Sequence, residues 1–227
     1  MRRTSGRFRP SLARRLAGSG LAWRRLLLAL VLVPGGLAAL LIGCATTPPA
    51  NQTQLCAIFD QQPRWYRLAA ESEARWGTPI AIQMAFVQQE SSFQARARPP
   101  RGRVLGVLPG RRASSAFGYA QAIDAAWEDY RAATGRRFAR RSNMADALDF
   151  IGWYNHVSHR RLGIPLTDAR HLYYAYHEGH GGYRRGTWRQ KAWLQQVAGR
   201  VEQRAASYQQ QLATCEARFA RRGWWSR

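Results

Sequence analysis

The sequence predicts an all-α protein, and two observations lead to that prediction. Several segments repeat apolar residues every three or four positions, which is the spacing of one helix face. No segment shows sustained alternation of apolar and polar residues, the pattern of a half-buried strand. A chain of 227 residues is long enough to bury a substantial core in one domain. We therefore expect one helical domain whose two ends differ from its middle.

The first 43 residues resemble an export signal. Residues 1–25 carry eight arginines and no acidic residue, and residues 26–42 form an apolar run of 17 residues that contains Pro34. Basic, apolar and then small residues in this order are typical of a signal peptide. The run is short for a membrane span, which needs about 20 apolar residues. We predict that residues 1–43 are removed, with an uncleaved membrane anchor as the alternative.

The sequence LIGC at residues 41–44 resembles a bacterial lipobox, whose cysteine is acylated and becomes the mature N-terminus. We therefore predict that Cys44 carries a lipid anchor; the alternative is an incidental cysteine at the end of an apolar run. The next residue is Ala45 rather than Asp, which among bacterial lipoproteins implies the outer membrane. The expected location is the periplasmic face of the outer membrane, where the anchor makes the membrane a partner.

The net charge of the chain restricts the classes of partner that we expect besides the membrane. Without residues 1–43 the chain keeps 27 Lys and Arg against 13 acidic residues, a net charge of about +14. Such an excess suits nucleic acid, anionic lipid or an acidic wall polymer, and export argues against nucleic acid. The arginines are scattered along the chain, so a solvated basic surface explains them equally well. Two cysteines remain, Cys56 and Cys215, and an exported protein allows them to form a disulfide. Two separate buried thiols are the alternative.

The expected elements follow in chain order. Residues 44–59 form the anchor and a polar tether, in which residues 45–54 reach about 33 Å when extended. The main domain spans residues 60–216 and begins with a helix at 63–76, between Pro63 and Gly77. Thr78 is expected to cap the next helix, with Pro79 in its first turn and its end near Glu90.

The second half of the domain is also expected to be helical. Residues 94–117 hold six arginines, three prolines and three glycines, which predicts a long basic loop. Asn143 is a good cap for one later helix, and a Thr-Asp pair for another that stops at Gly179. The helices expected here span 120–133, 144–162, 167–179 and the stripe from Leu194 to Cys215, followed by a basic aromatic tail at 217–227.

Glu90 is the first candidate for chemistry. It ends the apolar segment IAIQMAFVQQESSF at residues 80–93, where burial and the negative end of the helix dipole both disfavour its ionised form. A carboxyl group that stays protonated near neutral pH is a general acid. Arg96 or Arg98 could instead neutralise it, which would make it a structural residue.

Three short motifs place the chain near a known family. The segments ESSF (90–93), GYAQ (118–121) and YAYHEGHGGY (174–183) resemble, in order, the Glu-Ser, Gly-Leu-Met-Gln and Ala-Tyr-Asn-Ala-Gly signatures of lytic transglycosylases related to goose-type lysozyme. The resemblance covers roughly residues 60–215. It implies a lysozyme-like helical domain with a groove for the glycan strands of peptidoglycan. We expect the chain to be a monomer.

The resemblance also implies roles for individual residues. Glu90 would be the catalytic acid and base, and Tyr176 would form a hydrogen bond near its carboxyl group. The remaining groove residues that it implies are Ser91, Tyr119, Gln121 and, in the place of the family's Asn-Ala, His177 and Glu178.

A conventional glycosidase uses two carboxylates, whereas one suffices if the substrate assists. Glu90 would protonate the glycosidic oxygen, the sugar's N-acetyl group would stabilise the developing cation, and the 6-hydroxyl would attack to give a 1,6-anhydro sugar. Glu178 leaves alternatives open: it either activates water, as in a lysozyme-type hydrolase, or pairs with Arg184 or Arg185. A non-catalytic peptidoglycan-binding lipoprotein is a further alternative. The 94–117 loop either covers the groove and holds acidic stem peptides or is an insertion.

No cofactor is expected, and the histidines do not predict a metal site. His177 and His180 are three residues apart, rather than the four of a metalloprotease helix, and Gly179 between them ends the helix.

Overall fold

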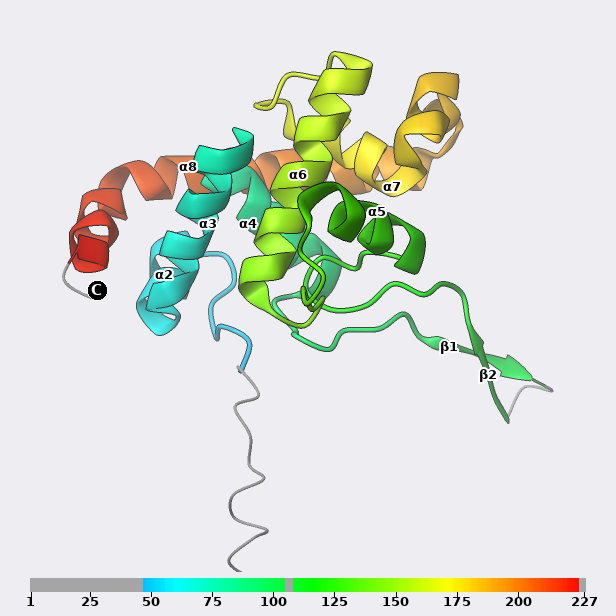
Figure 1. The fold of residues 1–227 in the computed structure, drawn as a ribbon, viewed down its shortest axis with the longest axis horizontal. Helices are drawn as coiled ribbons and strands as arrows, with labels where there is room; N and C mark the ends of the chain where they lie inside the picture. Colours follow the sequence, from blue (N-terminus) through cyan, green and yellow to red (C-terminus); the bar gives the residue numbers. More distant parts are fainter. Residues whose placement is uncertain (1–46, 105–107, 225–227) are drawn as a thin grey trace, which may run out of the picture. The chain divides into compact units, whose positions relative to one another are not determined.

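The computed structural model describes residues 47–104 and 108–224. The export signal at 1–43 and the lipid anchor at Cys44 therefore lie outside the described residues. The described part contains the following elements, labelled as in Figure 1: α2 (Leu55–Gln61), α3 (Pro63–Trp76), α4 (Ile80–Ser91), β1 (Arg101–Val104), β2 (Leu108–Arg112), α5 (Asp124–Thr134), α6 (Met144–Leu162), α7 (Ala169–Arg185), the 3-10 helix η1 (Thr187–Gln190) and α8 (Ala192–Trp224). Within the described residues the fold is all-α with one short two-stranded sheet, which confirms the fold class predicted from the sequence.

Helix α4 is the central element of the core. Every side chain from Ile80 to Val87 is buried, including the polar Gln83. A helix that is apolar on all sides must be enclosed, and α4 packs against α3, α6 and α8 (Figure 1). The Gln83 amide is bound inside this core, since it donates to the carbonyls of Ala69 and Thr78. The segment that carries Glu90 is therefore held rigidly.

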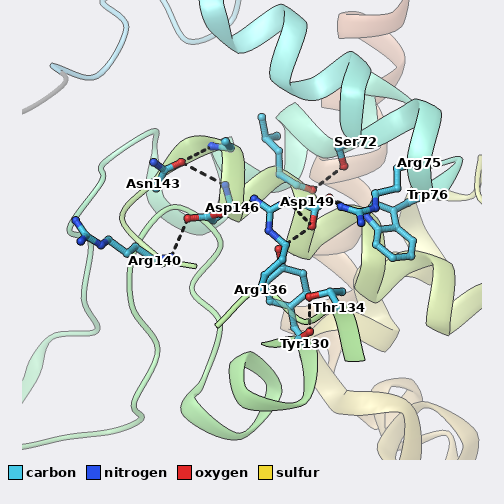
Figure 2. A network of polar contacts seen from close by, with 12 residues as sticks. Ser72, Arg75, Trp76, Tyr130, Thr134, Arg136, Arg140, Asn143, Asp146 and Asp149 are labelled. Atoms are coloured by element: carbon cyan, nitrogen blue, oxygen red, sulfur yellow. Dashed lines mark hydrogen bonds and ion pairs between the residues drawn. The ribbon is translucent and has the colours of Figure 1, made fainter. Parts of the chain in front are cut away.

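A buried acidic residue joins three helices beside this core. Asp149 of α6 accepts hydrogen bonds from Trp76 Nε1 of α3 at 2.9 Å and from Tyr130 Oη of α5 at 2.7 Å. Arg75 and Arg136 complete its surroundings with ion pairs at 3.4 and 3.5 Å (Figure 2). A buried carboxylate with this many donors and cations is fully compensated, so the network fixes α3 and α5 on α6.

The two ends of the domain fold back onto each other, which corrects two predicted boundaries. The predicted tether at 44–59 is too long, because α2 starts at Leu55 and buries Leu55, Ile58 and Phe59 with helical spacing. The predicted tail at 217–227 is helical as far as Trp224, and Phe219 packs edge-on against Phe59 with ring centroids 5.5 Å apart.

The disulfide expected from the sequence joins these same two ends. Cys56 in α2 and Cys215 in α8 are 159 residues apart in the chain, and their Cα atoms lie 6.2 Å from each other. That separation suits a disulfide without backbone movement.

Other elements differ in detail from the prediction. The basic loop contains the antiparallel strands β1 and β2, with Val104 opposite Leu108. Thr78 makes no cap hydrogen bond to α4; Glu73 of α3 accepts from the backbone N–H of Ile80 instead. Helix α7 kinks at Gly179, where φ is 71°, and then continues to Arg185 because the following residues resume helical geometry. Asn143 caps α6 as predicted. In the part of the chain that the structure describes, no helix is both long and apolar enough to span a bilayer.

Candidate active site

Glu90 lies in the last turn of α4 and is half-buried. Its Oε1 accepts a hydrogen bond of 2.8 Å from Tyr173 Oη of α7. Burial raises the pKa of Glu90 to about 7, although the Tyr173 hydrogen bond acts in the opposite direction by favouring the ionised form. Among the described residues, no cation contributes to this shift. The carboxyl group therefore exchanges its proton near neutral pH, as a general acid and base requires.

The backbone after Glu90 turns sharply in a conformation that non-glycine residues rarely adopt. Ser92 and Phe93 have φ angles of 48° and 60°, in the left-handed region. The Phe93 ring is buried and stacks on Trp65 of α3 at 5.6 Å between centroids, which holds the turn in place. This anchored turn fixes the position of Glu90 at the end of α4.

The GYAQ segment forms a second turn next to the first. Gly118 donates its N–H to the carbonyl of Ala97 at 3.0 Å, and the Gln121 amide donates to that same carbonyl at 3.0 Å. Gly118 has φ of 80°, and a Cβ there would lie 2.0 Å from the carbonyl oxygen of Arg141. The turn therefore requires glycine, because any side chain would collide with a neighbouring backbone.

Aromatic rings join the third motif to the other two. Tyr176 of α7 donates its hydroxyl to the carbonyl of Ala120 in the GYAQ turn. Phe86 of α4 packs edge-on against both Tyr173 and Tyr176, with ring centroids 5.3 Å away in each case. The three motifs, which are far apart in the sequence, are thus brought together around Glu90.

Among protein-family models, that of the transglycosylase SLT domain matches the chain over residues 32–215. The chain belongs to this family. The match covers most of the chain and agrees with the resemblance inferred from the three motifs and with the lysozyme-like helical fold. No curated protein and no solved structure matches the chain. Membership of the SLT family indicates lytic transglycosylase activity on the glycan strands of peptidoglycan.

The SLT domain does not place every predicted groove residue at an open surface. Tyr119 is 1 % exposed and packs edge-on against Trp65, so it is a core residue rather than part of a groove wall. Ser91 is buried too, and its hydroxyl donates to the carbonyl of Val87 in its own helix. Gln121 is half-buried, with its amide N–H groups turned to backbone carbonyls. These residues shape the backbone around Glu90.

The tyrosine that contacts Glu90 directly is Tyr173, which the motifs do not contain. Tyr176, expected to form a hydrogen bond near the carboxyl group, donates to the carbonyl of Ala120 and lies close enough to Glu90 for its charge to act on the tyrosine. Residues 173 and 176 are three apart and therefore share a helix face, but the motif begins at Tyr174 and includes only Tyr176 of the two.

The Glu178 carboxylate is bound by three neighbouring side chains. Its side chain is 5 % exposed and lies 2.8 Å from Lys191 Nζ, with Thr187 and His177 also hydrogen-bonded to it. Desolvation raises its pKa, but the hydrogen bonds from Lys191, Thr187 and His177 outweigh it and lower the pKa to about 2. The expected pairing with a basic residue is present, but the partner is Lys191 rather than Arg184 or Arg185. Gly182 lies against the Glu178 side chain on the other side of the kink at Gly179. The kink turns the chain toward η1.

A pocket of about 750 Å³, here called the large pocket, opens among α5, α6 and α7. Its lining includes Ile123, which follows the GYAQ turn by two residues and is 46 % exposed, and the aromatic rings of Trp153 and Tyr154. Tyr154 packs edge-on against Tyr176 at 5.2 Å between centroids. The large pocket is therefore in contact with the aromatic residues that surround Glu90, and its volume suits a ligand of several rings.

In the described ranges, no group of His, Cys, Asp and Glu residues is arranged to hold a metal ion.

Proposed function

We propose that the chain is a peptidoglycan lytic transglycosylase that cleaves the β-1,4 bond between N-acetylmuramic acid and N-acetylglucosamine. The observation that carries the proposal is Glu90: a half-buried carboxyl group with a pKa of about 7, held by Tyr173 in a member of the SLT family. Such a group can give a proton to a leaving oxygen and then take one from a nucleophile without a change of pH.

The reaction needs one acidic residue of the protein. Glu90 transfers its proton to the glycosidic oxygen, and the C1–O bond breaks. The carbonyl oxygen of the substrate's own N-acetyl group stabilises the positive charge at C1. The Glu90 carboxylate then removes the proton of the 6-hydroxyl, whose oxygen attacks C1. The product is a 1,6-anhydro sugar, no water is consumed, and Glu90 is protonated again.

The surroundings of Glu178 and Asp124 favour this mechanism over hydrolysis. A second carboxylate would have to remove a proton from water, yet both oxygens of Glu178 are bound by donors and its pKa of about 2 makes it a weak base. Asp124 lies on the solvent side of α5 and pairs with Arg141 at 2.7 Å.

The variant Glu90→Gln tests the assignment. Glutamine keeps the shape and the hydrogen bond with Tyr173 but cannot transfer a proton, so cleavage of purified cell wall should fall by at least about 10²- to 10⁴-fold. Full activity of Glu90→Gln would contradict the enzyme assignment and leave a peptidoglycan-binding lipoprotein as the better description.

The products separate the two enzymatic mechanisms. If the 6-hydroxyl attacks, the products end in an anhydro sugar, carry no heavy oxygen after digestion in labelled water, and still form in Glu178→Gln. If Glu178 activates water, the label enters the reducing ends and Glu178→Gln is as inactive as Glu90→Gln.

We also propose that the domain works while anchored to the periplasmic face of the outer membrane. The support is the LIGC sequence with Ala45 behind it and the basic and apolar residues at 1–42. Because α2 begins at Leu55, the segment between Cys44 and this first helix of the described residues is short and would keep the domain close to the lipid. Replacing Cys44 by Ala should release the protein into the soluble fraction or leave an unprocessed precursor. An unchanged membrane fraction would contradict the anchor.

A further inference from the structure

A smaller pocket of about 380 Å³, here called the arginine pocket, lies where α6 ends, α7 begins and ends, and η1 follows. Its lining does not include Glu90 or any residue of the three motifs before Tyr183. Three of its seven lining residues are arginines: Arg161, Arg184 and Arg189.

These three guanidinium groups have no carboxylate partner within the described part of the chain, and all three residues are exposed. Other arginines of the domain do have one; Arg170, for example, lies 2.6 Å from Glu202. The charge of Asp168 reaches this pocket, since it raises the pKa of Tyr183. The Asp168 side chain, however, caps α7 by accepting a hydrogen bond from the N–H of His171. Like charges around one pocket repel each other, and a bound anion would remove that repulsion.

Two of the guanidinium groups act on one histidine, and the third lies over a ring of the arginine pocket. Burial lowers the pKa of His180, and the charges of Arg161 and Arg184 lower it further. Arg189 lies over the ring of Trp188, with its Cζ 4.9 Å from the centroid. Because guanidinium forks bind carboxylates by paired hydrogen bonds, a cluster of this kind suits an anion with several oxygens.

The walls of the arginine pocket are ordered aromatic side chains. Trp188 stacks on Tyr174 with ring centroids 4.4 Å apart and a 10° angle between their planes. His171 Nδ1 and the Tyr183 hydroxyl are 2.7 Å apart. Together with Leu162, these rings form an apolar surface next to the charges. A ligand with both carboxylates and methyl groups would fit this combination better than a bare anion.

The arginine pocket adjoins the large pocket, because Arg161 lines both. The large pocket is in turn lined by His180 and Tyr154, whose rings stack at 4.6 Å, and Tyr154 packs against Tyr176 beside Glu90. A glycan strand that occupied the large pocket would thus lie next to Arg161. The acidic groups attached to such a strand are the carboxylates of its alanine-containing stem peptides.

We propose that the arginine pocket binds the carboxylates of peptidoglycan stem peptides, so that the enzyme prefers glycan strands that carry peptides. This inference rests on the proposed function, since it assigns a second part of the same substrate. It adds a binding site outside the three motifs, in which Arg161, Arg184 and Arg189 recognise the peptide and take no part in the bond cleavage.

The double variant Arg184→Gln/Arg189→Gln tests the inference, with Arg185→Gln as a matched control. Arg185 is an exposed arginine in the same helical turn that does not line the arginine pocket. The substrates are peptide-bearing glycan strands and the same strands after an amidase has removed the peptides. The double variant should raise KM on the order of tenfold for peptide-bearing strands, with kcat little changed. It should leave KM for the bare strands unchanged, and Arg185→Gln should alter neither.

Two results would overturn the inference. One is a wild-type enzyme with equal KM values for both substrates; the other is a double variant that weakens both equally. Thermal unfolding of each variant shows whether a change comes from the pocket or from the fold.

A direct binding measurement separates this inference from the catalytic assignment. A free stem tetrapeptide is titrated into the Glu90→Gln protein by calorimetry, with and without the Arg184→Gln/Arg189→Gln changes, and inorganic phosphate is titrated as a second probe. Binding of the peptide that depends on the arginines supports the inference even if Glu90→Gln retains activity. Binding of phosphate without binding of peptide overturns it, even if Glu90 is essential for cleavage.

Discussion

At the scale of single residues, Tyr173 controls the carboxyl group on which the proposed mechanism depends. Its hydroxyl donates to Glu90 Oε1 and thereby stabilises the ionised form against the effect of burial. The hydrogen bond therefore keeps the pKa of Glu90 lower than burial alone would set it. Without it, Glu90 would remain protonated to a higher pH and would be a weaker acid in the first, proton-donating step.

The variant Tyr173→Phe should reveal the effect of this hydrogen bond on the pKa of Glu90 through the pH dependence of kcat/KM. In the wild type, kcat/KM should decline above about pH 7 as Glu90 loses its proton. In Tyr173→Phe the decline should move to higher pH. Tyr176→Phe is the comparison, because its hydroxyl bonds to the carbonyl of Ala120 rather than to Glu90. A decline that stays in place in Tyr173→Phe, or that moves equally in both variants, would contradict the assigned role.

The residue scale also shows what the sequence can and cannot reveal about the site. The position of Glu90 was predictable, since a long apolar segment that ends in an acid already implies burial of a carboxyl group. The contact with Tyr173 was not, because two helices that are distant in the sequence must first pack together. The partner of Glu178 was hidden for a similar reason: the kink at Gly179 and the turn through η1 bring Lys191 back to it.

At the scale of elements, the two irregular turns after α4 and before α5 determine the geometry of the site. Gly118 allows the second turn to pass against the backbone at Arg141, and the carbonyl of Ala97 receives hydrogen bonds from both ends of the GYAQ segment. The first turn carries Ser92 and Phe93 with positive φ. Strained backbone of this kind persists where surrounding packing enforces it, and it is common at active sites.

The variant Gly118→Ala should disrupt this arrangement. Its Cβ would lie 2.0 Å from the Arg141 carbonyl oxygen, and its φ of 80° is unfavourable for alanine. We expect a loss of unfolding free energy on the order of 3 kcal/mol and a loss of wall cleavage. Gly135→Ala is a matched control, since its φ is 70° but its Cβ would have no atom within 4 Å. It should be clearly less destabilising; equal effects would mean that φ alone, rather than the close approach, makes Gly118 necessary.

Regular helices were the most predictable elements. The bounds of α3 and α6 agree with the sequence because local signals set them: Gly77 ends α3 in the left-handed conformation and Asn143 caps α6. The hairpin of β1 and β2 was missed, since its short strands carry arginine, proline and glycine instead of alternating apolar residues. The cap of α4 was also missed, because Glu73 of another helix supplies it.

At the scale of the whole molecule, the ends of the domain were the least predictable part. Three apolar residues of α2 are too few to stand out beside a polar segment, and their burial depends on contact with α8 at the opposite end of the sequence. The sequence signal that these two ends meet was the pair of cysteines, Cys56 and Cys215, which form a disulfide. An interaction over such a long separation cannot be read from local periodicity.

The stability of the whole molecule should also reflect the raised pKa of the proposed catalytic carboxyl group. The pKa of Glu90 is about 7 in the folded protein and near 4.5 in the unfolded chain. Between these pH values the folded state binds more protons than the unfolded state, so Glu90 makes the free energy of unfolding decrease as the pH rises from about 4.5 to 7. The decrease levels off above pH 7, where its size is at most on the order of 3 kcal/mol.

The variant Glu90→Gln removes this titration and isolates the effect. Urea unfolding of wild type and Glu90→Gln should give similar stabilities at pH 4.5 and a clear advantage for Glu90→Gln at pH 8, although the variant is inactive as an enzyme. The comparison between variants cancels the contributions of the other titrating groups, including Glu178, whose low pKa makes its contribution fall only below about pH 4.5. Parallel stability curves would show that Glu90 keeps an ordinary pKa in the folded state. It would then be ionised at neutral pH, and the first step of the mechanism would lack its proton donor.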